Sequence, residues 1–323
     1  MHEVLDHKIS SPMSWISNTV LDQGGLVRLN DECLRELEHV VNELRANPLP
    51  DVALNPKFFN MPACNALMLK IREQISTGIG LAIIDRLPIQ DCDETIAKKL
   101  YWLLMSMVGQ PVAQKWEGTL LYDVRDEGGR DIAGSNIRSS KTNGDQGYHV
   151  DNAFNLPPEF VSLLCLQPAK EGGTSGIISF ETVHNILRRD HPNILARLYE
   201  PFYFDRQMEH APGEVRTISK PIFETDGETI ETNYSPNVIY RGYEMIDEEM
   251  DEDTHAALQA IKNVCESPGV GKDLEFEIGQ IQILNNRRIG HRRTAYVDWP
   301  ESNRQRHLVR IWIRDQGLPF YHG

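Results

Sequence analysis

Strand-like runs separated by turn residues dominate the chain beyond Gly109, and they restrict the possible folds more than any other feature. Glycine pairs at 128–129 and 172–173 mark two of the turns. Short strands at such spacing favour an antiparallel sandwich or barrel over a parallel sheet built from βαβ units. The predicted strands cover residues 119–124, 159–166, 175–180, 202–205, 217–223, 229–233, 274–284 and 305–313.

Helical periodicity marks the region before these strands. Asn30-Asp31 is a good N-cap, and apolar residues recur after it at helical spacing up to Leu44. A second helix is predicted over residues 63–75, and a buried strand follows at 81–84. Asp91 or Asp93 can cap a third helix that stops at Gly109. Further helices are predicted at 183–189, 192–198 and 254–265.

Together these elements predict a mainly β protein with flanking helices, folded as a double-stranded β-helix (jelly roll). We expect one domain over residues 1–323. Its helical N-terminal region would span about 1–77, and its jelly-roll core with inserted helices about 78–323.

Composition excludes several classes of function. The 33 basic and 47 acidic residues give a formal charge of −14, which disfavours nucleic acid and anionic membranes as partners. No G-x-G-x-x-G or Walker loop is present. The five cysteines are widely spaced and form no C-x-x-C pair, which disfavours a disulfide framework or a structural zinc site. No signal peptide or membrane span is visible in the sequence. We expect a cytoplasmic protein that binds a small-molecule substrate, and homo-oligomerisation stays open.

The segment His149-Val150-Asp151 and the distant His291 are the candidate metal ligands. Two imidazoles and one carboxylate form the facial triad that holds Fe(II) and leaves coordination positions open. Residues i and i+2 of a strand share a face, so His149 and Asp151 can reach one metal. With 11 histidines and 47 acidic residues, about 1.6 His-x-Asp/Glu matches arise by chance. The tripeptide alone is therefore more typical of a satisfied surface or turn histidine, and its surroundings carry the argument.

The last predicted strand has two distinct faces. Val309, Ile311 and other apolar residues share one face, and Arg306, Arg310 and Trp312 share the other. If helices cover the apolar face, both arginines point into the barrel. The alternative is an amphipathic strand whose arginines face solvent.

Four segments resemble the taurine dioxygenase (TauD/TfdA-like) family of Fe(II)/2-oxoglutarate-dependent oxygenases. The resemblance runs from about Gly78 to Arg314 and rests on order and spacing, because each motif is weak alone. The segments are GYHVDNAF, FVSLLCLQPAKEGGTS, GQIQILNNRRIGHRRTAYVDWPE and RHLVRIWIRD.

This resemblance implies a role for each matching residue. His149, Asp151 and His291 match the metal ligands, and O₂ and 2-oxoglutarate would be co-substrates. Arg306 matches the arginine that pairs with the far carboxylate of 2-oxoglutarate. Ser175 or Thr174 would supply a hydroxyl to the same carboxylate. Arg310 matches a position that contacts an anionic substrate in some relatives.

One position departs from the family pattern. Relatives often have a small residue directly after the distal histidine, whereas here Gly290 precedes His291 and Arg292 follows it. The inverted order would alter the packing near the metal or place another cation at the mouth of the site.

The predicted activity is hydroxylation, desaturation or ring closure at an unactivated C–H bond of a small, anionic or amino-acid-like metabolite. Arg293 and Arg138 are further candidates for binding it, and the loop 130–146 is either a lid or an ordinary surface loop. Two other functions stay open. They are a catalytically silent jelly roll that binds metal or ligand, and a zinc hydrolase that uses the same ligands.

Overall fold

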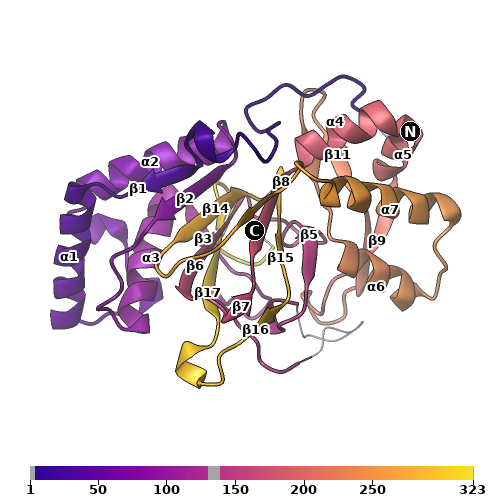
Figure 1. The fold of residues 1–323 in the computed structure, drawn as a ribbon. Coiled ribbons are helices and arrows are strands. Elements are labelled where there is room, and N and C mark those ends of the chain that lie inside the picture. Colours follow the sequence, from indigo (N-terminus) through magenta and orange to yellow (C-terminus); the bar gives the residue numbers. More distant parts are fainter. Residues whose placement is uncertain (1–3, 130–138, 323) are drawn as a thin grey trace.

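The last strand, β17, lies second from one edge of the larger of the two main sheets, between β6 and the short strands β3 and β4 (Figure 1). The structure is a computed structural model, and it describes residues 4–129 and 139–322. The strand order is β1-β2-β14-β6-β17-β3, with β4 also paired to β17. Only the β1–β2 pair within this sheet is parallel. The strands are β1 (Leu26–Arg28), β2 (Leu81–Asp85), β3 (Gln110–Val112), β4 (Tyr122–Val124), β6 (Phe160–Gln167), β14 (Ile281–Asn285) and β17 (His307–Arg314).

A smaller antiparallel sheet in the order β13-β8-β15-β5 faces the larger one. Apolar side chains from both sheets pack together, among them Ile177 and Ile289 from the smaller sheet and Leu284 from the larger. The predicted double-stranded β-helix is thus confirmed. The strands are β5 (Gln146–His149), β8 (Ser175–Ser179), β13 (Lys272–Leu274) and β15 (Ile289–Arg293), and three two-stranded pairs add β7 (Glu171–Gly172) with β16 (Tyr296–Val297), β9 (Pro201–Asp205) with β10 (Thr217–Pro221), and β11 (Phe223–Thr225) with β12 (Ile230–Thr232).

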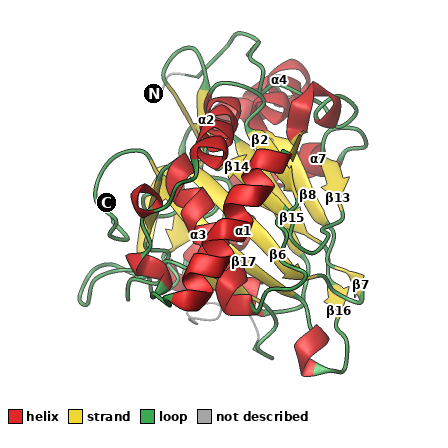
Figure 2. Cartoon of the chain, turned by 90° about the vertical axis from the view of Figure 1, so that its left-hand side faces the viewer, coloured by secondary structure: helices red, strands yellow, loops and turns green. Residues whose placement is uncertain are grey.

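Three N-terminal helices cover the outer face of the larger sheet (Figure 2). They are α1 (Asp31–Ala46), α2 (Pro62–Ser76) and α3 (Glu94–Val108). Asn30 caps α1 by accepting from the Cys33 amide, and Asp93, not Asp91, caps α3. Beneath them lie Val309 and Ile311 of β17. The apolar face of β17 is therefore buried under helices, and the opposite face, with its arginines, points into the barrel.

Four further helices, α4 to α7, pack with residues of the smaller sheet around a second hydrophobic core. The predictions for α4 (Phe180–Asp190), α5 (Pro192–Leu198) and α7 (Glu252–Glu266) are confirmed, whereas α6 (Pro236–Ile246) was not predicted. Gly242 explains the omission, because glycine inside a helix is unfavourable. A Cβ on Gly242 would lie 2.4 Å from the Tyr203 carbonyl oxygen, so glycine allows α6 to approach β9.

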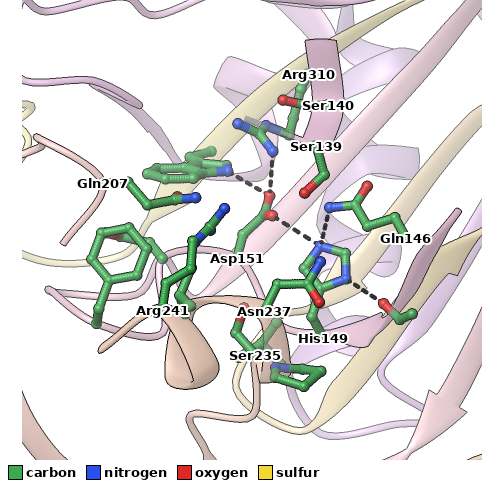
Figure 3. Close-up of a pocket in the computed structure, with 17 residues that line it drawn as sticks. Ser139, Ser140, Gln146, His149, Asp151, Gln207, Ser235, Asn237, Arg241 and Arg310 are labelled. Carbon is green, nitrogen blue, oxygen red and sulfur yellow. Dashed lines mark hydrogen bonds and ion pairs between the residues drawn. The ribbon is translucent and has the colours of Figure 1, made fainter. Parts of the chain in front are cut away.

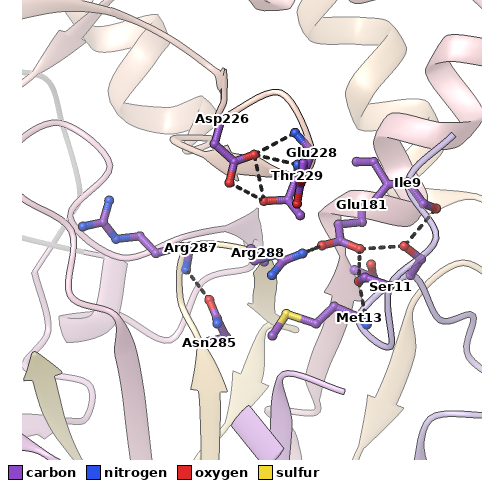
Figure 4. Close-up of polar contacts among 12 residues, drawn as sticks. Ile9, Ser11, Met13, Glu181, Asp226, Glu228, Thr229, Asn285, Arg287 and Arg288 are labelled. Atoms are coloured by element: carbon purple, nitrogen blue, oxygen red, sulfur yellow. Dashed lines mark hydrogen bonds and ion pairs between the residues drawn. The ribbon is translucent and has the colours of Figure 1, made fainter. Parts of the chain in front are cut away.

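Buried Glu181 ties the N-terminal segment to α4 (Figure 4). Its carboxylate accepts from the hydroxyls of Ser11 and Ser14 and pairs with Arg288. A buried carboxylate needs such compensation for lost hydration. The contact holds residues 9–14 against the body of the protein.

Two predicted strands differ from the structure. Residues 274–284 form the end of β13 and most of β14, separated by a turn region, and residues 217–223 contain β10 and the start of β11. β5 and β15 were not predicted, because neither shows a clear apolar alternation. Short turns of irregular helix lie at Leu21–Gly25, Asp51–Ala53, Pro56–Phe58, Ser139–Lys141 and Ser302–Arg304. None of the helices in residues 4–129 and 139–322 is long and apolar enough to cross a membrane.

Gly290, which precedes His291 in β15, packs against an aromatic ring. A Cβ at this position would lie 2.4 Å from Cε2 of Phe180. We predict that Gly290→Ala lowers the free energy of unfolding by about 1–3 kcal/mol through overpacking. Urea denaturation measures the change, with Gly147→Ala as a control, because a Cβ at position 147 would have no heavy atom within 4 Å. Equal stability of the two variants would contradict the packing argument.

Candidate metal centre

Strand pairing brings the three predicted metal ligands together. His149 is the last residue of β5, and its register partner in β15 is His291. Asp151 lies in the turn after β5, so the turn, not strand alternation, directs its carboxylate to the same point. Asp151 Oδ1 is 3.7 Å from Nε2 of each histidine, and the three candidate ligand atoms lie within 4.8 Å of one another. All three residues are buried.

Hydrogen bonds orient two of these ligands. The Gly147 carbonyl oxygen lies 2.9 Å from Nδ1 of His149 and can only accept, so Nδ1 carries the proton and Nε2 keeps its lone pair. The Asp151 backbone is held by Asn286, whose side chain accepts from its amide at 2.8 Å and donates to its carbonyl at 3.0 Å. Such outer contacts fix the direction in which a ligand atom points.

The second carboxylate oxygen of Asp151 is occupied by two donors. Trp312 Nε1 donates to Oδ2 at 2.8 Å, and Arg310 Nη1 lies 3.0 Å from the same atom (Figure 3). Burial alone raises the pKa of Asp151, but Arg310 and the two imidazoles bring that pKa below its ordinary value. The carboxylate is therefore ionised, and Oδ1 is the oxygen turned toward the histidines.

The protonation state of His291 also suits metal binding. Burial, together with the neighbouring His149, lowers the pKa of His291 to about 3. Its imidazole is therefore neutral at physiological pH, as a metal ligand must be. Two imidazoles and one carboxylate are the donor set that fits Fe(II) in a facial triad.

A second group of possible metal ligands consists of Glu94, Asp123 and His307, but a lysine already pairs with its two carboxylates. Lys98 Nζ lies 2.7 Å from both carboxylates. His307 Nε2 is 2.8 Å from Asp123 Oδ1. An ammonium group in the middle of the cluster disfavours a cation, so these residues form an ion-pair network between α3, β4 and β17.

The predicted 2-oxoglutarate residues border a cavity next to the triad. Arg306, Ser175, His149 and His291 line it. Arg306 is 4% exposed, and its Nη1 has no hydrogen-bond partner among the described residues. The Ser175 hydroxyl donates to Gln282 at 3.1 Å inside this region. Thr174 does not line the cavity, and its hydroxyl donates to Glu275 near the surface.

Arg310 lies between this cavity and a second pocket on the other side of Asp151, and it lines both. The sequence leaves open a structural role in which Arg310 pairs with Asp298 or Asp315, which lie near the two ends of its strand, but Arg310 pairs with neither. Asp298 accepts from the Arg306 amide, and Asp315 pairs with Arg72.

The other arginines considered for the substrate have different positions. Arg293 borders the cavity, but its hydrogen bonds go to backbone oxygens of Ser139 and Gly144. Arg138 and most of the candidate lid lie in residues 130–138, outside the described part of the chain. Ser139, Ser140 and Gln146, from the described end of that segment, line the second pocket.

The unusual Arg292 borders the cavity beside the triad, but its charge is paired with a carboxylate. It forms a two-pronged ion pair with Asp273, and its side chain crosses Gly176 in the neighbouring strand. Its guanidinium also lies 5.0 Å from the ring centre of Tyr148. The inverted Gly-His-Arg order thus places a further cation at the border of the cavity, where Asp273 neutralises it, and packs its side chain over Gly176.

Sequence reasoning missed two residues of the site. Trp312 shares a strand face with Arg310, and that alternation was the available signal. Arg241 lines the second pocket from α6, which was not predicted, so no sequence signal pointed to it.

We predict that Asp151→Ala abolishes tight Fe(II) binding while the fold persists, because the carboxylate is the only anionic ligand of the triad. Isothermal titration under anaerobic conditions measures the affinity, and circular dichroism checks the fold. Asp273→Ala, which removes a surface carboxylate, should bind the metal as the wild type does. Wild-type affinity in Asp151→Ala would remove this residue from the ligand set.

We predict that Trp312→Phe weakens Fe(II) binding about 10–100-fold, because the second oxygen of Asp151 loses a donor that holds the carboxylate in place. Trp102→Phe is the matched control, since Trp102 Nε1 donates to the Leu54 carbonyl instead. The same anaerobic titration compares the two variants. Equal affinities would show that Trp312 only fills space.

Comparison with known proteins finds one matching family and relatives that are similar over most of the chain. A profile of the taurine catabolism dioxygenase TauD, TfdA family matches residues 58–312. The FR-33289 synthase of Streptomyces rubellomurinus is 26% identical over 97% of this chain and 92% of its own length. The taurine hydroxylase-like protein SAT17 of Stachybotrys chartarum is 23% identical over 96% of this chain and 81% of its own.

Solved structures share the fold at lower identity. An asparagine oxygenase bound to Fe(II), 3-hydroxyasparagine and succinate has a TM-score of 0.66 at 16% identity, covering 90% of this chain and 93% of its own. The non-haem iron oxygenase OrfP, bound to iron and α-ketoglutaric acid, has a TM-score of 0.62 at 15% identity, with coverages of 90% and 94%. Because the family profile spans most of the chain, this protein belongs to the TauD/TfdA family of Fe(II)/2-oxoglutarate-dependent dioxygenases.

Proposed function

We propose that this dioxygenase hydroxylates an unactivated C–H bond of a small, anionic or amino-acid-like metabolite. The observation that carries the proposal is the shared cavity, in which the ligands His149 and His291 stand beside the buried, incompletely paired Arg306. A buried guanidinium with an unsatisfied donor and no carboxylate partner is energetically costly, so it indicates an anionic ligand. The asparagine oxygenase and OrfP structures contain hydroxylated amino acids, which supports this substrate class.

The residues of the site would divide the work as follows. His149, Asp151 and His291 would hold iron, which with 2-oxoglutarate and O₂ supplies oxidation of a C–H bond coupled to formation of succinate and CO₂. Arg306 would pair with the far carboxylate of 2-oxoglutarate, and Ser175 is better placed than Thr174 to donate a hydroxyl to it. The apolar neighbours Leu163 and Leu308 limit access of water to this end of the cavity.

On the substrate side, Arg310 has one donor nitrogen to offer. Its Nη2 is buried and has no partner among the described residues. We propose that this nitrogen donates to an anionic group of the substrate. The same ligands serve desaturation and ring closure, so the position of the C–H bond relative to the metal, set by the substrate, selects the outcome.

Anaerobic addition of Fe(II) and then 2-oxoglutarate tests the proposal. A visible charge-transfer band is expected once both are bound, and succinate should form when O₂ is admitted. A silent jelly-roll protein would give the band without succinate above the level of a no-enzyme control. A zinc hydrolase would give neither, and that result would contradict the proposal.

We predict that Arg306→Ala raises the apparent 2-oxoglutarate requirement at least about a hundredfold. Its physical basis is a penalty of about 3–5 kcal/mol for leaving the far carboxylate buried and unpaired. Succinate formation at increasing 2-oxoglutarate measures the effect. Arg304→Ala is the matched control, because Arg304 is half-exposed and lies over the Trp299 ring. An unchanged requirement in Arg306→Ala would exclude the assigned role.

A further inference from the structure

The hydrogen bonds of Arg310 limit how it can hold a substrate. Its Nε donates to Gln114 at 2.8 Å, and its Nη1 lies 3.0 Å from Asp151. Only Nη2 lacks a partner among the described residues. Bidentate recognition of an oxyanion uses two nitrogens of the guanidinium fork. Nη2 is therefore the nitrogen of Arg310 that is free of partners within the described part of the chain, and a donor from another residue would complete two-point recognition of an oxyanion.

Arg241 of α6 occupies the position from which that second donor can come. It lines the second pocket together with Arg310, Asp151 and Trp312. In Figure 3 its side chain rises from α6 and points toward Asp151. Arg241 is 8% exposed, and its Nε lies 3.4 Å from Asp205 Oδ2. Arg241 is thus a buried cation that lines the pocket and forms an ion pair with Asp205 of β9.

The fold brings Arg241 to this place by a specific packing device. Gly242, the next residue, lets the α6 backbone approach β9, where a Cβ would lie 2.4 Å from the Tyr203 carbonyl oxygen. That approach also brings Arg241 to Asp205, the last residue of β9. The position of Arg241 therefore depends on the close contact between α6 and β9.

The charges of the loaded site call for one more anion. Iron, Arg306 and Arg310 would be opposed by Asp151 and the 2-oxoglutarate dianion, which leaves a positive excess that Arg293 at the cavity border increases. Arg241 and Asp205 compensate each other. Among the described lining residues of the second pocket, Asp151 is the only acidic one. A substrate with one oxyanion group at this end would reduce the positive excess.

We propose that Arg241 is a substrate-binding residue that, with Nη2 of Arg310, holds one oxyanion group of the substrate between α6 and β17. This inference rests on the proposed function and adds the location of the recognised group. The ligand chemistry is a carboxylate, sulfonate or phosphonate. Gln207 and Asn237 supply neutral polar contacts, and Phe154 and Val238 provide an apolar wall for the substrate body.

Anaerobic spectroscopy with three anions tests the proposal. Propionate, ethanesulfonate and ethylphosphonate are each titrated into the enzyme preloaded with Fe(II) and 2-oxoglutarate, and the shift of the visible band reports binding. At least one anion should bind, and propionamide, the neutral counterpart, should not. Which anion binds most tightly identifies the class of oxyanion.

Variants then locate the binding group. Arg241→Gln should bind the anion at least about tenfold more weakly, because a charge-assisted hydrogen bond is lost, and Arg241→Lys should recover part of the affinity. Arg197→Gln is the matched control, since Arg197 lies on α5 and contacts Thr254 and Phe202. Absence of anion binding in the wild type, or equal affinity in Arg241→Gln, would overturn this inference. Absence of the band before any anion is added would instead contradict the proposed function.

Discussion

The carboxylate of Asp151 is the group on which the rest of the site depends. It is buried beside two imidazoles, and a carboxylate in such surroundings requires full compensation for its lost hydration. Trp312 and Arg310 satisfy one oxygen, Asn286 holds the backbone, and the other oxygen remains for a metal. The supporting groups come from β17 and from the residue directly after β14, so both the larger sheet and the smaller one must be in place before the triad exists.

β17 links stability and chemistry in one strand. Its apolar face, with Val309 and Ile311, packs beneath the N-terminal helices. Its other face carries Arg310 and Trp312 to Asp151. A shift of the strand by one residue would exchange the two faces. Burial of the apolar face under α1–α3 therefore also fixes which side chains reach the metal centre, although those helices are remote from it.

The two sides of the centre differ in how rigidly they are built. The side that we propose for the co-substrate is formed largely by strands of the two sheets, with Ser175 in β8 and Arg306 directly before β17. The side that we propose for the substrate is completed by α6 and by Ser139, Ser140 and Gln146. Elements outside the sheets tolerate replacement more readily than paired strands do. This division is consistent with structurally similar oxygenases that share the iron centre and bind different products, such as hydroxyasparagine and hydroxyarginine.

Much of the site was predictable because the signals are local. The ligands His149 and Asp151 are two residues apart, and the alternation of β17 separated its arginines from its core residues. Helix caps at Asn30 and Asp93 were equally local. β15 was missed although it carries His291, because its residues lack the apolar pattern of a strand and its conformation comes from pairing with β5 and β8.

The sequence by itself determined the fold class, the metal ligands as candidates and the buried face of the last strand, since each follows from spacing along a few residues. Only the tertiary structure decided the partners. It paired Arg310 with Asp151 instead of Asp298 or Asp315, placed Ser175 and not Thr174 beside Arg306, and brought Arg241 to the pocket on an unpredicted helix. The physical reason is that compensation of buried charge depends on distances between segments far apart in the chain, and no local pattern encodes those distances.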